Sequence, residues 1–215
     1  QGVAGLFASA GRTSDSQISY VGSTSESRVG EYAIAVNQLA TQGSYTGAAV
    51  GAGPFAIDTN NNTFALKVNG TQSSTLTLTA GSYTSSALIA ELQSQINGDS
   101  TLQTASASIS VGFSATTNMF SFTSNSYGAN STVEFTAVGT TTQATLGFSV
   151  GVGTTGLDAA GTIGGETATG SGRKLTGASG GATGISVEVL GGAAGDRGTV
   201  SYSDGLSARL NTLLT

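Results

Sequence analysis

Short runs of alternating apolar residues, separated by glycine-rich turns, are the feature that most constrains this fold. The runs FALKV at 64–68 and YAIAV at 32–36 alternate large apolar residues with smaller or polar ones. A period of two residues is typical of a strand with one buried face. The chain has 33 glycines and a single proline, and glycine readily adopts the positive φ angles of tight turns. The sequence therefore predicts a mainly β (α+β) fold with many short strands.

The clearest local signals lie between residues 64 and 98. Asn69-Gly70 directly follows the 64–68 run, and this dipeptide is the strongest short signal for a hairpin. In the segment 84–98, Thr84 or Ser85 is the expected N-cap and Asn97-Gly98 the expected end of a helix. The apolar face of that helix comprises Leu88, Ile89, Leu92 and Ile96. We predict one interior helix here, inside a compact unit that spans about 51–150.

Further strands are predicted on both sides of residue 150. The run 109–113 is expected to pair with 120–123, and 133–137 with a possible strand at 146–150. Residues 41–53 are rich in glycine and alanine, which indicates a linker.

The segment GISVEVLGGAAGDRGTVSYSDGL (184–206) invites two interpretations, a phosphate-binding loop or a plain turn. Its glycine-rich tip lacks the Gly-Lys-Ser/Thr ending of a P-loop and the GxGxxG spacing of a dinucleotide fold. We therefore predict a hairpin, in which 185–189 pairs with 200–202. Its glycines would adopt left-handed turn geometry, with Asp196 and Arg197 solvated.

The composition argues against an enzyme. Cysteine and histidine are both absent, which removes thiol nucleophiles, the usual soft metal ligands and the side chain that normally titrates near neutral pH. The acidic residues are spread almost singly along the chain. A loop that begins at Asp58 resembles a calcium loop, but Thr63 and Asn69 stand where a glycine and a glutamate are needed. We expect no catalytic residue, no cofactor and no metal site.

The charge pattern argues against two classes of partner. The formal net charge is −5, and charged residues make up 9% of the chain. The seven basic residues form no stripe for nucleic acid or for acidic lipid. No segment approaches the ~20 apolar residues of a membrane span, and the N-terminal residues do not have the pattern of a secretory signal.

Three tyrosines lie in loop-like surroundings and are the best candidates for exposed contacts with a ligand or partner. They are Tyr45, Tyr83 and Tyr127. Each of them also fits a packed anchor of its loop.

Several stretches resemble the flagellar filament-capping protein family, also called hook-associated protein type 2. They are YAIAVNQLAT (32–41), FALKVNGTQSSTLTLTAGSYTSSALIAELQSQING (64–98), GTIGGETATGSGRKLTGASGGATG (161–184) and ISVEVLGGAAGDRGTVSYSDGLSARL (185–210). The last of these, with its Gly-Asp-Arg-Gly-Thr-Val run, is the most specific. Residues 99–155 resemble the family only in general character, and the fold prediction for them rests on hydrophobic periodicity alone.

The resemblance implies a fragment with two β-rich head domains, the second inserted into the first. It places a discontinuous β domain at 22–50 and 151–204 and the inserted domain at 51–150. Residues 1–21 and 205–215 would be short helical stubs of the N-terminal and C-terminal legs, which continue outside a fragment.

The resemblance also implies a non-catalytic role. The protein would form a ring-shaped homo-oligomer at the distal tip of the bacterial flagellum, outside the cell, after export without a cleaved signal peptide. It would assist the folding and insertion of flagellin. Two alternatives stay open: an adhesin that binds host mucin or other glycans, and a flagellin or phage tail-fibre domain.

Overall fold

The computed structural model describes residues 10–205, and it confirms the mainly β (α+β) class. The chain divides into two compact units. Unit 1 comprises the described residues up to Ala40 and those from Asp158 onward, and unit 2 is Thr41–Leu157. Unit 2 is therefore inserted between the two halves of unit 1. Each unit has its own buried apolar cluster, and no residue belongs to both clusters.

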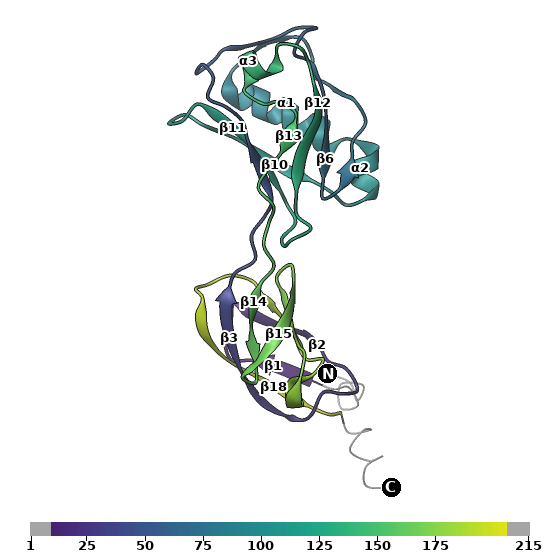
Figure 1. The fold of residues 1–215 in the computed structure, drawn as a ribbon, viewed down its shortest axis with the longest axis vertical. Coiled ribbons are helices and arrows are strands. Elements are labelled where there is room, and N and C mark those ends of the chain that lie inside the picture. The colour runs from purple at the N-terminus through teal and green to yellow at the C-terminus, as the bar shows by residue number, and fades with distance from the viewer. Residues whose placement is uncertain (1–9, 206–215) are drawn as a thin grey trace, which may run out of the picture. The chain divides into compact units, whose positions relative to one another are not determined.

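Unit 1 is a single antiparallel sheet of eight strands (Figure 1). The order across the sheet is β1-β18-β3-β14-β15-β16-β17-β2. The strands are β1 (Ala10–Thr13), β2 (Ile18–Gly22), β3 (Gly30–Gln38), β14 (Ala160–Ile163), β15 (Glu166–Ser171), β16 (Lys174–Gly177), β17 (Ser186–Val189) and β18 (Gly195–Ser203), with a short 3-10 helix, η2 (Gly180–Ala182). Alternation along β3 buries Ile34 and Val36 in the core of this unit, as the sequence pattern predicts.

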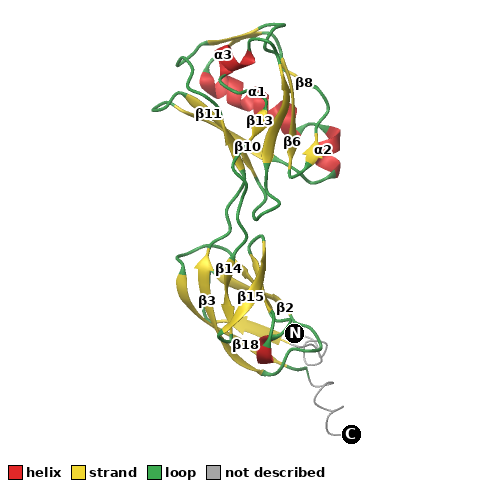
Figure 2. Cartoon of the chain, in the orientation of Figure 1, coloured by secondary structure: helices red, strands yellow, loops and turns green. Residues whose placement is uncertain are grey.

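Unit 2 packs short sheets against helices, which Figure 2 draws in yellow and red. One sheet has the order β10-β11-β4, another β13-β12-β6-β7 with β8 also paired to β6, and β5 pairs with β9. The strands are β4 (Ser44–Thr46), β5 (Phe55–Ile57), β6 (Thr63–Val68), β7 (Thr71–Gln72), β8 (Leu76–Thr77), β9 (Gly81–Tyr83), β10 (Ile109–Ser114), β11 (Met119–Ser124), β12 (Val133–Val138) and β13 (Gly151–Val152). The helices are α1 (Ser85–Asn97), α2 (Ser100–Thr104) and α3 (Thr142–Leu146).

The local signals of unit 2 are confirmed. Thr84 caps α1 with its side chain, and the helix buries Leu88, Leu92 and Ile96. At the β6–β7 turn Asn69 and Gly70 both have positive φ, at 53° and 81°, which is the geometry of a type I′ hairpin turn. The pairing of β10 with β11 also agrees with the prediction.

The predicted pairing of 185–189 with 200–202 is wrong. β17 pairs with β16 and β2, whereas β18 pairs with β1 and β3. The glycine-rich segment between them is a crossover between distant positions in the sheet. The long strand β3 gives β18 a more extensive antiparallel partner than the four residues of β17.

Other boundaries also differ from the prediction. Residues 10–21, expected within the leg stub 1–21, contain β1 and all but the last residue of β2 in the unit 1 sheet. The expected linker 41–53 contains β4, which pairs with β11, so unit 2 begins at Thr41 and not at 51. The expected strand at 146–150 does not form: α3 ends at Leu146, and the strand that pairs with β12 is β13, at 151–152. The helical stubs predicted at 1–9 and 206–215 lie outside the described residues.

Because unit 2 has its own core and its ends meet, we predict that a polypeptide of residues 41–157 folds alone. The N–H of Thr41 donates to the carbonyl of Leu157 at 2.8 Å, and Ser44 and Thr154 form a β-bridge. Its urea unfolding, followed by circular dichroism, should be one cooperative transition with a free energy on the order of 5–10 kcal/mol. A spectrum without native secondary structure would contradict this.

Candidate functional site

Tyr45, one of the three predicted contact residues, is a core residue. Its side chain is 9% exposed, and its ring packs edge-on against Phe135 with centroids 4.9 Å apart. The hydroxyl donates to the carbonyl of Ser149 and accepts from the N–H of the same residue, both at 3.0 Å. Tyr45 thus anchors β4 to the segment after α3. The expectation that it is exposed is wrong because β4 is a strand and not a linker.

Tyr83 and Tyr127 lie on other elements of unit 2. Tyr83 ends β9, packs against the core and donates its hydroxyl to the carbonyl of Thr79 at 2.8 Å. Tyr127, in the connection between β11 and β12, is 38% exposed. Of the three, Tyr127 presents the most open ring.

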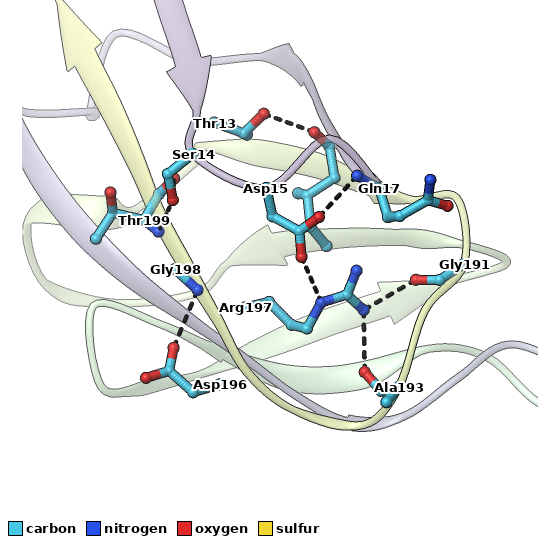
Figure 3. A network of polar contacts seen from close by, with 11 residues as sticks. Thr13, Ser14, Asp15, Gln17, Gly191, Ala193, Asp196, Arg197, Gly198 and Thr199 are labelled. Atoms are coloured by element: carbon cyan, nitrogen blue, oxygen red, sulfur yellow. Dashed lines mark hydrogen bonds and ion pairs between the residues drawn. The ribbon is translucent and has the colours of Figure 1, made fainter.

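Sequence reasoning missed a polar network in unit 1, centred on Arg197 (Figure 3). Arg197 follows Asp196 at a point where the β18–β3 register shifts, so the strand bulges between Asp196 and Thr199. Gly198 has φ of 74°, and a Cβ there would lie 2.1 Å from the Oγ of Ser14. The positive φ favours glycine at this position, and a Cβ would also force the Ser14 hydroxyl to move.

The bulge directs the Arg197 side chain under the neighbouring loops, where it is 7% exposed. Its Nε donates to the carboxylate of Asp15 at 2.6 Å, and its Nη1 donates to the carbonyls of Gly191 at 2.9 Å and Ala193 at 3.0 Å. Figure 3 shows these three contacts arriving from the β1–β2 turn and from the loop before β18. The prediction that Arg197 is solvated is therefore wrong, whereas Asp196 is exposed as expected.

The partner carboxylate is held in its charged form. The hydrogen bond from Arg197, followed by the one from the N–H of Gln17, holds the pKa of Asp15 below its ordinary value. A guanidinium bonded to a carboxylate and two carbonyls has most of its donors occupied by the protein itself. The arrangement can fix the β1–β2 turn and the loop before β18 in place, and it offers no group for proton transfer near neutral pH.

A second network, in unit 2, is centred on Asp99. This carboxylate is 6% exposed and caps α2 through the N–H groups of Thr101 and Leu102, at 3.1 and 3.0 Å. It also accepts from the N–H and the hydroxyl of Ser74. Burial is the largest influence and raises the pKa of Asp99, but the hydrogen bonds together lower it below the ordinary value. Asp99 thus joins α2 to the β7–β8 connection.

An open hollow of about 480 Å³ lies beside Asp99 and is lined mainly by hydroxyl and amide side chains. No aromatic side chain lines it, so it offers no platform on which a sugar ring could stack. Within residues 10–205, no group of three or more acidic side chains is arranged to hold a metal ion. No helix in the same range is long and apolar enough to cross a membrane.

Comparison by sequence identifies no relative. Neither a protein-family model nor a curated protein sequence matches the chain significantly.

Comparison by structure gives several matches. The D2-D3 domains of the flagellar cap protein FliD from Escherichia coli match 93% of this chain over their whole length, with a TM-score of 0.58 and 19% identity. The chain has the fold of flagellar cap head domains. A D1-D2-D3 structure of the same Escherichia coli protein matches 97% of this chain with a TM-score of 0.61 and 18% identity, and this chain covers 59% of it. FliD from Pseudomonas aeruginosa PAO1 matches 97% of this chain, and 91% of its own, with a TM-score of 0.55 and 18% identity.

The FliD-like fold includes both units. Because the alignment covers at least 93% of the chain in these three structures, it includes most of residues 99–155, where the sequence resembles the family only in general character. The resemblance stated from the sequence is confirmed at the level of the fold.

We predict that Arg197→Ala destabilises unit 1 by roughly 2–4 kcal/mol, because it removes three charge-assisted hydrogen bonds to two loops. Arg197→Lys should lose part of this, because an ammonium cannot reproduce the planar fork. Arg173→Ala is the matched control, since the ion pair of Arg173 with Glu188 is more than one-third exposed and should contribute no more than ~1 kcal/mol. Urea unfolding measures all three, and equal losses for Arg197→Ala and Arg173→Ala would contradict the structural role.

We also predict that Asp99 makes the stability of unit 2 dependent on pH. Since its folded pKa is lowered, its stabilising effect is complete above the ordinary Asp pKa of about 4 and is lost as pH falls through the folded value. The difference in unfolding free energy between the wild type and Asp99→Asn should therefore shrink between pH 7 and pH 3. Urea unfolding across this range tests it, and a difference that stays constant would refute it.

Proposed function

We propose that this chain is the head of a structural cap at the distal end of a bacterial flagellar filament, where it assists the folding and insertion of exported flagellin. The observation that carries the proposal is the match of both units to the D2-D3 domains of a flagellar cap protein along the whole of that chain. The location would be extracellular, and the partners would be flagellin and further copies of the protein in a ring.

The chemistry of the chain supports a structural role. The two buried networks, around Arg197 and Asp99, use their charged groups to fasten loops and a short helix. Cysteine is absent, so the fold forms without disulfides. Hairpins with strong local turns, such as the one at Asn69-Gly70, close short loops at little entropic cost. Such a chain is suited to folding after export as an unfolded polypeptide.

The surface of unit 2 carries few charges, which suits brief contacts with incoming subunits. Between Thr41 and Leu157 the charged residues are Asp58, Lys67, Glu91, Asp99 and Glu134. Asp99 is buried and Lys67 pairs with Glu134 at 3.6 Å. Few charges remain to repel or steer an incoming subunit by long-range electrostatics.

Deletion of the gene in its source bacterium tests the proposal. We expect loss of motility and release of unpolymerised flagellin into the medium, with both restored by the wild-type gene. Electron microscopy with a specific antibody should place the protein on filament tips. Normal filaments in the deletion strain would refute the cap role. Long filaments formed by the protein alone would favour a flagellin or tail-fibre role, and mucin binding without location at the tip would favour an adhesin.

A further inference from the structure

The sheet of unit 1 curls back on itself, so that its two end strands lie side by side. β1 and β2 stand at opposite ends of the strand order, yet residues 14–17 join them directly. The hydroxyl of Thr13 donates to the carbonyl of Ile18 at 2.6 Å, and a Cβ on Gly11 would lie 2.2 Å from the ring of Tyr20. No β-ladder joins the two strands in the part of the chain that the structure describes. We call this junction the seam.

The seam contains a hollow of about 520 Å³ with one uncompensated charge. Arg12 and Leu190 line the hollow, and both are exposed. Within residues 10–205 the guanidinium of Arg12 forms no ion pair and no hydrogen bond. Asp15 also lines the hollow, but its carboxylate is bonded to Arg197 (Figure 3). Glu31, two strands from Arg12, instead accepts from a threonine hydroxyl. The hollow therefore favours an acidic occupant.

The turn between β14 and β15 is an acidic projection of the same unit. Gly164 and Gly165 have φ of 68° and 85°, and they join the paired residues Ile163 and Glu166, as in a type I′ turn. A Cβ on Gly165 would contact nothing within 4 Å, so the tip is narrow and open. Glu166 is exposed, and among the described residues its carboxylate accepts only from the hydroxyl of Ser179, at 3.5 Å. Its charge is free to meet a cation of another molecule.

The turn and the hollow lie on different sides of unit 1. β14 and β15 are the two central strands in the order across the sheet. Because the ends of the sheet meet at the seam, this central hairpin is the part of the curled sheet farthest from it. Arg12 is in register with Glu31 of β3 through the intervening strand β18. The N–H of Gly164 donates to the carbonyl of Ala33, two residues further along β3, so the turn and the hollow lie at a similar height.

We propose that the β14–β15 turn of one copy enters the seam hollow of the next copy, where Glu166 pairs with Arg12. The two glycines bring no side chain into the hollow, and the exposed side chain of Leu190 offers an apolar wall for their backbone. A projection and a complementary hollow on different sides of one molecule make a head-to-tail contact, which generates a ring when the rotation between neighbours closes. The inference rests on the proposed self-assembly and names a contact for it.

The contact is small, because one turn fills one hollow. An interface below ~1,000 Å² is weak and transient, and opposite charges across it contribute to orientation and specificity more than to affinity. The contact therefore forms where the rest of the protein holds neighbouring copies close together, which raises their effective concentration. The test has to use the full-length protein.

Disulfide trapping tests the proposal, because the chain has no cysteine of its own. Ser19→Cys places a thiol in the hollow, and Thr167→Cys places one beside Glu166, both at exposed positions. Under mild oxidation the double variant should form a ladder of covalent oligomers about tenfold faster than either single variant forms dimers. A need for both cysteines identifies a head-to-tail contact, since a two-fold contact would crosslink a single variant.

Charge reversal in the double-cysteine protein is the decisive control. Glu166→Lys should slow crosslinking to the rate of the single variants, because like charges would meet in the hollow, and added Arg12→Glu should restore it. Glu26→Lys changes the net charge equally at an exposed site in the β2–β3 connection, and it should leave the rate unchanged. A double variant no faster than the singles would overturn the proposal. So would an equal effect of Glu166→Lys and Glu26→Lys, or a failure of Arg12→Glu to rescue.

The outcomes separate this contact from the cap role. If the protein is found on filament tips but the double-cysteine variant crosslinks no faster than the single variants, the contact is refuted and the cap role stands. If the ladder forms and responds to charge reversal while a deletion strain makes normal filaments, the contact stands and the cap role is refuted.

Discussion

Contacts among phenylalanine rings hold unit 2 together. Phe135 of β12 lies with its ring centroid 4.9 Å from Phe122 of β11 and 4.9 Å from Phe148, which follows α3. These rings come from both larger sheets and from the segment that leads to β13, so one cluster fixes all of them. Because large apolar side chains are concentrated in this cluster, the surface of the unit can consist of small polar residues without loss of a core.

Unit 1 is stabilised differently. Its core consists largely of aliphatic side chains such as Ile34 and Val187, and the ring–ring contacts in the described residues all lie in unit 2. Two of its connections, the β1–β2 turn and the loop before β18, are fastened by Arg197, whose guanidinium bonds to both. Unit 1 therefore combines an apolar core with a buried polar network. In both units the buried charged groups serve structure.

Sequence reasoning succeeded where the determining contacts are local. The Asn69-Gly70 turn and helix α1 depend on residues within one or two turns of chain, and both were predicted. It failed where the partner is distant: β18 prefers β3, more than 150 residues away, over its neighbour β17. The predictions that Arg197 is solvated and that Tyr45 is exposed failed for the same reason. A bulge buries Arg197 and the short strand β4 buries Tyr45, although the sequence around each residue is typical of a loop. A glycine on each side of Asp196-Arg197 was the one available signal for the bulge.

Each unit is stabilised by its own buried core. Hydrogen exchange of the Phe135→Ala variant, resolved by residue, tests the independence of the two cores. The substitution should cost unit 2 about 3–5 kcal/mol, so amides between 41 and 157 should exchange faster while those of β3, β14 and β18 keep their wild-type protection. Equal loss of protection in both units would show that the two cores act as one and would contradict their independence.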